Sequence, residues 1–237
     1  MIQVEGIFSG GSAISAPIIG KDFNWTGGDG TYQVLDDGGG NWRIKFLSSG
    51  TFTPLKNMVV DAFLVGGGGG AGSSYCGEGG AGYTTTVRSV VLTANTAYSI
   101  VVGAAGTNGN PSSAGGETTA FTASAAGGKN TSNGTSSSKR PGGAGGSGGA
   151  GYVSPVATTT GGTDGGDGTS SATTGGKGQG TTTREFGEAD GTLYASGGGS
   201  NLTATVSNSG NGGRNGITSI EPADGIVVIR QHKEVAA

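Results

Sequence analysis

The run GGAGGSGGAG at Gly142–Gly151 constrains this chain more than any other feature. Two glycines and one small residue recur there with a period of three. Polyproline-II-type helices have three residues per turn and no internal hydrogen bonds. Their N–H and C=O groups must therefore pair with neighbouring segments, and only chains nearly free of side chains pack closely enough for that. The run predicts a bundle of polyglycine-II helices, hydrogen-bonded side by side.

Glycine recurs as doublets through much of the remaining sequence. The chain has 55 glycines among 237 residues, while charged residues make up only 12% and the formal net charge is −3. Disordered chains are usually more highly charged, and the lack of a basic patch argues against nucleic acid or anionic membranes as partners. The glycines predicted to be structural positions of the bundle are Gly142, Gly143, Gly145, Gly146, Gly148 and Gly149.

Apolar residues gather towards the two ends of the chain in short segments typical of strands. Trp42–Phe46 alternates, with Ile44 and Phe46 on one side and Arg43 and Lys45 on the other, as in a half-buried strand. No segment shows the amphipathic period of an α-helix, so we expect an all-β fold. The further strands predicted are Met1–Val4, Thr31–Leu35, Met58–Val65, Tyr83–Leu92, Tyr98–Val102 and Gly225–Arg230.

The last of these strands follows more than a hundred glycine-rich residues with too few apolar side chains for a core of their own. We therefore expect it to return and pair with the N-terminal strands near Met58–Val65. This predicts a small, jelly-roll-like β-sandwich built from residues 41–102 and 221–237, into which residues 103–220 are inserted as the polyglycine-II bundle. Residues 1–40 are predicted to be an attachment segment or an extra pair of strands.

No group of residues typical of catalysis is found. The only histidine, His232, and the only cysteine, Cys76, indicate neither a nucleophile–base pair nor a zinc site. GxGxxG at Gly67–Gly72 precedes SSYCGEGG, which cannot open the helix that a dinucleotide site needs. GGTDGGDG at Gly161–Gly168 lacks the apolar residue and the many copies of calcium-binding β-rolls. We expect no enzymatic activity, no cofactor and no metal.

The start of the chain, MIQVEGIFSGG, has no basic segment or long apolar run. A secretory signal is therefore not expected. No apolar stretch approaches the roughly 20 residues that cross a membrane, so membrane insertion is not expected either. A single thiol fits synthesis in a reducing cytosol.

Three aromatic residues in the loops of the glycine-rich region stand where almost no core exists to bury them. Tyr152, Phe186 and Tyr194 lie in the bulkier loops between glycine segments, with Arg184 among them. Exposed aromatic rings are typical of sugar or protein recognition, and an arginine adds a bidentate donor. These four residues are the predicted binding site at the loop tips, although the rings could equally cap the ends of the bundle.

The order of several segments is similar to that of a known family. WRIKFLSSGTFTP, MVVDAFLVGGGGGAG, YSIVVGAAG and GIVVIR resemble, over about Asn41–Arg230, the glycine-rich domain at the tips of bacteriophage tail fibres and related appendages. The resemblance implies a virion protein, made in the host bacterial cytoplasm, that recognises a host cell-surface glycan or protein. By the same analogy we expect contacts with other virion proteins and a homotrimer.

Two alternatives remain open at this point. One is a capsid-attached head fibre or decoration protein with an architectural role. The other is an ice-binding protein, since the threonine triplets can be interpreted as an ice-binding face. These triplets are Thr84–Thr86, Thr158–Thr160 and Thr181–Thr183.

Overall fold

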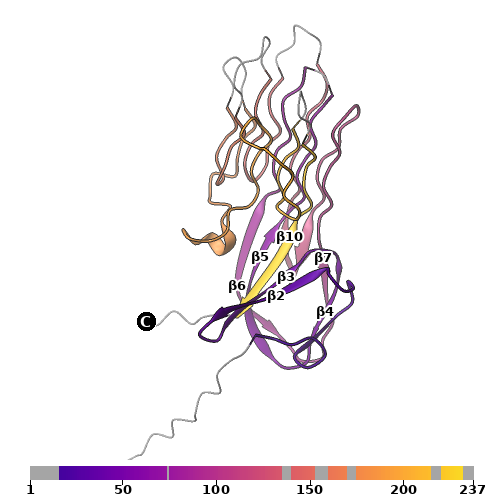
Figure 1. The fold of residues 1–237 in the computed structure, drawn as a ribbon, viewed down its shortest axis with the longest axis vertical. Coiled ribbons are helices and arrows are strands. Elements are labelled where there is room, and N and C mark those ends of the chain that lie inside the picture. The colour runs from indigo at the N-terminus through magenta and orange to yellow at the C-terminus, as the bar shows by residue number, and fades with distance from the viewer. Residues whose placement is uncertain are drawn as a thin grey trace, which may run out of the picture.

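The computed structural model describes residues 16–73, 75–134, 140–152, 160–169, 175–214 and 220–231. These residues form an all-β fold of two antiparallel sheets (Figure 1), and their one helical element is a single 3-10 turn, η1 (Glu185–Gly187). The predicted fold class is thus confirmed for the described residues, which include no α-helix. None of them forms a helix with the length and apolar content needed to cross a membrane. The predicted strand Met1–Val4 lies outside the described residues.

The first sheet has the strand order β1-β4-β7-β8-β9. Its members are β1 (Phe23–Trp25), β4 (Gly50–Pro54), β7 (Tyr98–Val101), β8 (Thr118–Ala120) and β9 (Ala123–Ala125). The strands β8 and β9 fall inside residues 103–220, so the sheet continues into the range predicted as an insertion. Their sequences, TTA and ASA, are too short and too small to show an apolar pattern.

The second sheet has the strand order β2-β3-β10-β5-β6. Its members are β2 (Tyr32–Gly38), β3 (Asn41–Phe46), β10 (Ile226–Gln231), β5 (Met58–Val65) and β6 (Thr84–Leu92). Residues 16–40 therefore supply one strand to each sheet, β1 to the first and β2 to the second.

The strand β10 lies between β3 and β5 in the second sheet. Ile226 is opposite Val65 and Arg230 is opposite Asp61 on one side, and Arg230 is opposite Arg43 on the other. The predicted return of the last strand to Met58–Val65 is confirmed. A continuous apolar run is typical of a strand covered on both faces, and β10 is such a strand.

The main hydrophobic core lies between the two sheets. Ile44 and Phe46 of β3 point into it and are fully buried, whereas Arg43 and Lys45 lie on the opposite face, as their alternation predicts. Phe52 of the first sheet packs against Phe46 of the second with ring centroids 5.4 Å apart. The remaining fully buried members of this core include Phe23, Val60, Ala62, Leu64, Leu92, Val227 and Ile229.

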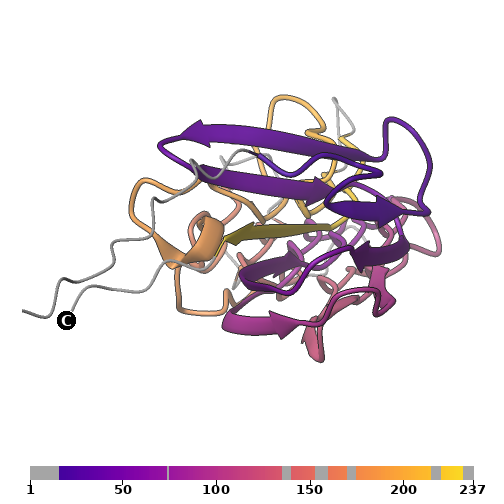
Figure 2. The same ribbon diagram turned by 90° about the horizontal axis from the view of Figure 1, so that it is seen from below.

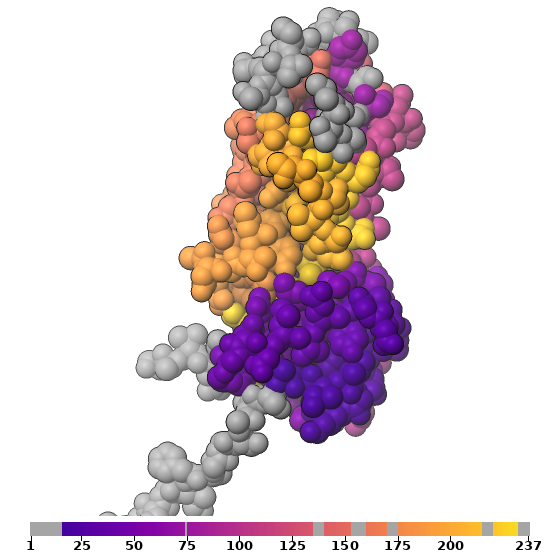
Figure 3. Space-filling view, in the orientation of Figure 1, coloured from indigo at the N-terminus to yellow at the C-terminus, as the bar shows by residue number. Residues whose placement is uncertain are grey.

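The glycine-rich segments extend from one end of the sheets as a stack of extended chains (Figures 1 and 3). Backbone hydrogen bonds join them: the Gly66 N–H donates to the Tyr83 carbonyl at 3.0 Å, and the Gly69 N–H to the Gly80 carbonyl at 2.8 Å. The Gly80 N–H in turn donates to the Lys129 carbonyl at 2.9 Å. Each segment thus hydrogen-bonds to others that are distant in sequence.

Neighbouring backbones in the stack leave no room for side chains. A Cβ placed on any of six glycines of the run GGAGGSGGAG would lie closer than 3.0 Å to a carbonyl oxygen of another segment or of the run itself. Those glycines are Gly142, Gly143, Gly145, Gly146, Gly148 and Gly149. At these positions only glycine avoids a clash with the backbone.

Candidate functional site

A segment of the glycine-rich region, residues 184–195, lies across the outer face of the second sheet, and we call it the strap. Phe186 in η1 and Tyr194 place their rings on Phe63 of β5, with centroid distances of 6.0 and 5.6 Å. Both strap residues are buried, at 2% and 6% exposure. Figure 2 shows η1 beside the end of β10.

The strap covers a second apolar cluster on this outer face. Phe63 and Val65 of β5 and Ile226 and Val228 of β10 form its floor, and all four are buried. Left in water, such a patch would be a costly exposed apolar surface. The rings of Phe186 and Tyr194 shield it, which explains why a glycine-rich segment carries two aromatic residues here.

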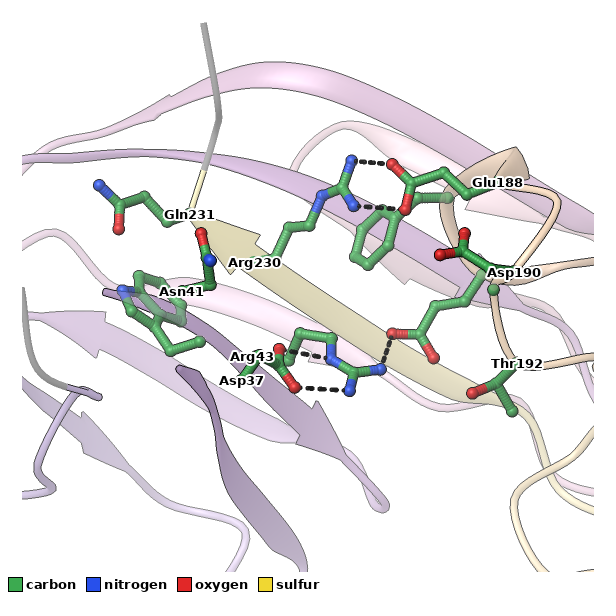
Figure 4. A pocket seen from close by; sticks show the side chains of 12 residues that line it. Asp37, Asn41, Arg43, Glu188, Asp190, Thr192, Arg230 and Gln231 are labelled. Atoms are coloured by element: carbon green, nitrogen blue, oxygen red, sulfur yellow. Dashed lines mark hydrogen bonds and ion pairs between the residues drawn. The ribbon is translucent and has the colours of Figure 1, made fainter. Parts of the chain in front are cut away.

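Ionic contacts fasten the strap to β3. The Arg43 guanidinium makes a bidentate pair with Asp37, at 2.8 and 2.7 Å, and also donates to Glu185 Oε1 of the strap at 2.8 Å (Figure 4). The hydrogen bonds with Asp37 raise the pKa of Arg43 above its ordinary value, despite partial burial. Because Glu185 is only 2% exposed, this guanidinium compensates a carboxylate that is removed from water.

A second arginine fastens the strap to β10. Arg230 donates to Glu188 Oε2 at 2.8 Å, reaches Asp61 Oδ2 at 3.2 Å, and lies over the Phe186 ring. Burial lowers the pKa of Arg230, but the hydrogen bonds with Glu188 and Asp61 outweigh this and hold it above the ordinary value. Asp61, which is 1% exposed, also pairs with Arg88 of β6 at 3.1 Å.

Tyr194 completes these contacts at the far end of the strap. Lys45 Nζ donates to its hydroxyl at 3.1 Å. Burial, and then the charge of nearby Glu185, raise the pKa of Tyr194 well above its ordinary value. The phenol therefore remains neutral over the whole physiological range.

A polar pocket of about 360 Å³ opens where the strap meets the ends of β3 and β10. Figure 4 shows Glu188, Asp190 and Thr192 of the strap along one side of it, and Asn41 and Gln231 at the other. The two arginines, Arg43 and Arg230, lie between these sides. We call this cavity the strap pocket. No group of three or more His, Cys, Asp or Glu side chains in the described parts of the chain is arranged to hold a metal ion.

A different aromatic pair lies at the opposite end of the molecule. Gly66–Gly72 follows β5 and Gly77–Gly82 precedes β6, so Tyr75 lies at the turn between these two glycine segments. The Tyr75 ring meets Tyr152 edge to face, at 5.7 Å and 88°. Tyr75 is 41% exposed and has a left-handed backbone, with φ of 49°. Figure 3 shows the glycine stack extending away from the indigo sheet residues.

A comparison with known families matches residues 47–230 to a model described as a glycine-rich domain. The chain belongs to this family. The match begins just after β3, so β1, β2 and β3 are sheet strands that precede it. None of the curated proteins compared with the chain matches it. The family match confirms the glycine-rich domain predicted from the order of segments; it carries no information on a viral setting.

The four predicted binding residues of this glycine-rich domain fall in two separate places. Tyr152 lies at the far end of the stack, whereas Arg184, Phe186 and Tyr194 belong to the strap. The expected exposure at loop tips is wrong for Phe186 and Tyr194, which are buried because the outer face of β5 and β10 needs an apolar cover. Arg184 pairs with Asp164 at 3.3 Å and donates to the Gly191 carbonyl at 3.1 Å.

Sequence reasoning missed Tyr75 and the two arginines that hold the strap, Arg43 of β3 and Arg230 of β10. Tyr75 had a usable signal, since it is the one bulky residue between the GGGGGAG and GEGGAG runs. The sequence pattern places Arg43 and Arg230 on the polar face of a strand. No local sequence feature predicts their partners in the strap.

Residues of the two glycine-rich motifs, GxGxxG and GGTDGGDG, make hydrogen bonds within the chain. The backbone N–H groups of Gly67 and Gly69, from the GxGxxG match, donate to carbonyls of neighbouring segments at 3.0 and 2.8 Å. In GGTDGGDG, a hydrogen bond from Thr182 lowers the pKa of Asp164, and one from Lys177 lowers that of Asp167. These groups are engaged in contacts within the chain. His232 lies outside the described residues.

Two of the threonine triplets take part in the fold. Thr183 is fully buried and donates to the Tyr194 carbonyl at 2.7 Å. The hydroxyls of Thr84 and Thr181 both accept from the Gln179 amide, at 2.8 and 3.1 Å. Most of the third triplet, at 158–160, lies outside the described residues.

Proposed function

We propose that this glycine-rich domain is a bacteriophage virion protein, the receptor-binding tip of a tail fibre or appendage, without enzymatic activity or cofactor. In this role it is made in the bacterial cytoplasm, joins other virion proteins as a homotrimer and contacts a host cell-surface glycan or protein. The observation that carries the proposal is the Tyr75–Tyr152 ring pair at the free end of the glycine stack, in which Tyr75 is 41% exposed and Tyr152 is half-buried. Exposed aromatic rings supply much of the energy of recognition surfaces.

The scaffold suits this role if the stack is a polyglycine-II bundle inserted in a jelly-roll-like sandwich. Support comes from the hydrogen bonds between distant glycine segments and from carbonyl oxygens that occupy the places of Cβ atoms. Such a bundle needs little apolar core, because its backbone groups satisfy one another. Loops at its end can therefore change without disturbing the sheets.

The backbone of Tyr75 adds to the argument. A non-glycine residue in the left-handed region costs on the order of 1 kcal/mol or more, and such strain clusters at ligand-binding sites. At Tyr75 it sets the ring against Tyr152 while leaving 41% of the residue exposed.

The test is the binding of fluorescently labelled protein to a panel of Gram-negative and Gram-positive bacteria. Wild type is expected to bind at least one strain, and Tyr75→Ala combined with Tyr152→Ala is expected to abolish that binding. Val91→Ala, which trims a 70% exposed apolar residue of β6 at the other end of the molecule, is the matched control. Binding that survives the double substitution, or no binding to any strain, would contradict the proposal.

An architectural role as a capsid decoration protein or head fibre is the second candidate. The burial of Phe186 and Tyr194 favours it, because two of the three aromatic residues predicted for recognition serve the fold instead. Binding to purified capsids without binding to cells would support this role. A molar mass measured in solution then tests the trimer in either case.

A further inference from the structure

The charges around the strap pocket do not balance. Among the described residues, five carboxylates and four cations line the strap pocket or belong to the ion-pair network that reaches it. The carboxylates are Asp37, Asp61, Glu185, Glu188 and Asp190, and the cations are Arg43, Lys45, Arg88 and Arg230. Every one of these groups has an opposite charge within 4.0 Å except Asp190, whose carboxylate has no ion pair with any described residue. This network of described residues therefore carries one surplus negative charge, which belongs to Asp190 in the pocket lining.

The two arginines that line the pocket are already engaged. Arg43 directs three N–H groups to Asp37 and Glu185, and Arg230 directs its guanidinium to Asp61 and Glu188. An anionic ligand would have to displace these carboxylates or approach the surplus charge of Asp190. Both arrangements are unfavourable, so the pocket selects against anions.

The uncommitted polar atoms of the pocket are mainly acceptors. Asn41 donates its amide N–H to the Gly38 carbonyl at 2.9 Å, which leaves its Oδ1 without a donor among the described residues. The Thr192 hydroxyl and the Gln231 amide likewise make no hydrogen bond to any described residue. A ligand that fits must bring several donors. The Phe186 ring is covered by Arg230, and the lining, which also includes Trp42, is more polar than apolar.

We propose that the strap pocket binds a small hydroxyl-rich ammonium compound of the amino-sugar class, with its ammonium group at Asp190. Its hydroxyls donate to Asn41, Thr192 and Gln231. The volume of about 360 Å³ lies within the range of small-molecule sites, about 300–1,000 Å³. This site is separate from Tyr75 and Tyr152, so the proposal does not depend on whether those two residues bind a receptor.

The experiment compares three monosaccharides of one size and different charge: glucosamine, glucose and glucuronate. Each is titrated at neutral pH into the full-length protein, with backbone amide NMR shifts as the readout. Glucosamine is expected to bind saturably at concentrations up to about 10 mM and to shift the amides of Gly191 and Thr192. Glucose is expected to bind about fivefold more weakly because it lacks the ion pair, and glucuronate should not bind.

The Asp190→Asn variant tests whether the preference for glucosamine comes from this site or from non-specific attraction to the negatively charged protein. The variant should remove the preference for glucosamine over glucose, and added salt should have the same effect on wild type. Asp29→Asn is the matched control, since Asp29 is an exposed aspartate in the β1–β2 turn. Equal affinity for glucose and glucosamine, tighter binding of glucuronate, unchanged selectivity in Asp190→Asn, or no binding of any sugar would overturn the proposal.

Discussion

The guanidinium of Arg230 in β10 lies over the ring of Phe186 in the strap, with Cζ 4.1 Å from the ring centroid. The same side chain pairs with Glu188 of the strap and with Asp61 of β5. One residue of the central strand thus holds the strap by a cation–π contact and an ion pair together. The strap is thereby part of the folded core, although it comes from the glycine-rich region.

Phe186→Ala should destabilise the protein strongly. The substitution leaves a cavity above Phe63 and removes the surface on which Arg230 stacks. A loss of about 3 kcal/mol or more in the free energy of unfolding is expected from buried phenylalanine truncations. Urea denaturation measures it, with Leu193→Ala, a 37% exposed residue of the same strap, as the control. Equal stability of the two variants would contradict the core role of Phe186.

Glu185→Gln should loosen the strap more than Glu188→Gln. Glu185 is buried and bonded to Arg43, whereas the Glu188 side chain is 44% exposed. Partly exposed ion pairs contribute up to about 1 kcal/mol, while breaking a buried pair costs several times as much. Hydrogen exchange of strap amides, such as Tyr194, provides the measurement. Faster exchange in Glu188→Gln than in Glu185→Gln would reverse the proposed order.

Asp22 should make stability depend on acid pH. A hydrogen bond from Lys56, at 2.6 Å, and one from the Ile18 N–H lower its pKa below the ordinary 3.8. A depressed carboxyl pKa stabilises the fold above the unfolded-state value, and that contribution disappears as the pH falls through the native pKa. The stability difference between wild type and Asp22→Asn should be full above about pH 5 and shrink steadily below it. A difference independent of pH would exclude this linkage.

Cys76 should be inert in the folded protein. It is 7% exposed, and burial, with the nearby Glu78 charge, raises the pKa of its thiol to about 11. Since only the thiolate reacts, labelling by a disulfide reagent at pH 8 should be at least about a hundredfold slower than in denaturant. The rate should rise with pH towards 11. Equal labelling rates in the folded and denatured protein would show that the thiol is accessible and ionised.

Gly146→Ala should disrupt the glycine stack. Its new Cβ would clash with the carbonyl oxygen of Gly82, and both groups belong to rigid backbone. Since overpacking usually costs 1–3 kcal/mol, a loss of about 3 kcal/mol is expected where no flexible side chain can yield. Gly166→Ala is the matched control, because its Cβ meets only the Thr163 carbonyl, at 3.1 Å. Thermal unfolding compares the two, and a tolerated Gly146→Ala would refute tight packing at this position.

The sequence by itself determined the five strands of the second sheet, the strand β7 and the positions that must be glycine, but not β1, β4, β8 and β9. Alternation separated Ile44 and Phe46 from Arg43 and Lys45, and the apolar run of β10 predicted its return to β5. The regular glycine run likewise marked positions where backbones meet without side chains. These features are local, because the side-chain period and the glycine spacing depend only on residues close together in the sequence.

Only the tertiary structure decided what covers the outer face of the second sheet. Arg43 and Glu185 are 142 residues apart in the chain, and no local pattern links them. The sequence pattern predicted exposed loop rings for Phe186 and Tyr194, because the residues that they pack with, such as Phe63 and Val228, come from distant strands. Local periodicity shows that a face is apolar; which segment buries it depends on the path of the whole chain, and here that path brings the strap onto β5 and β10.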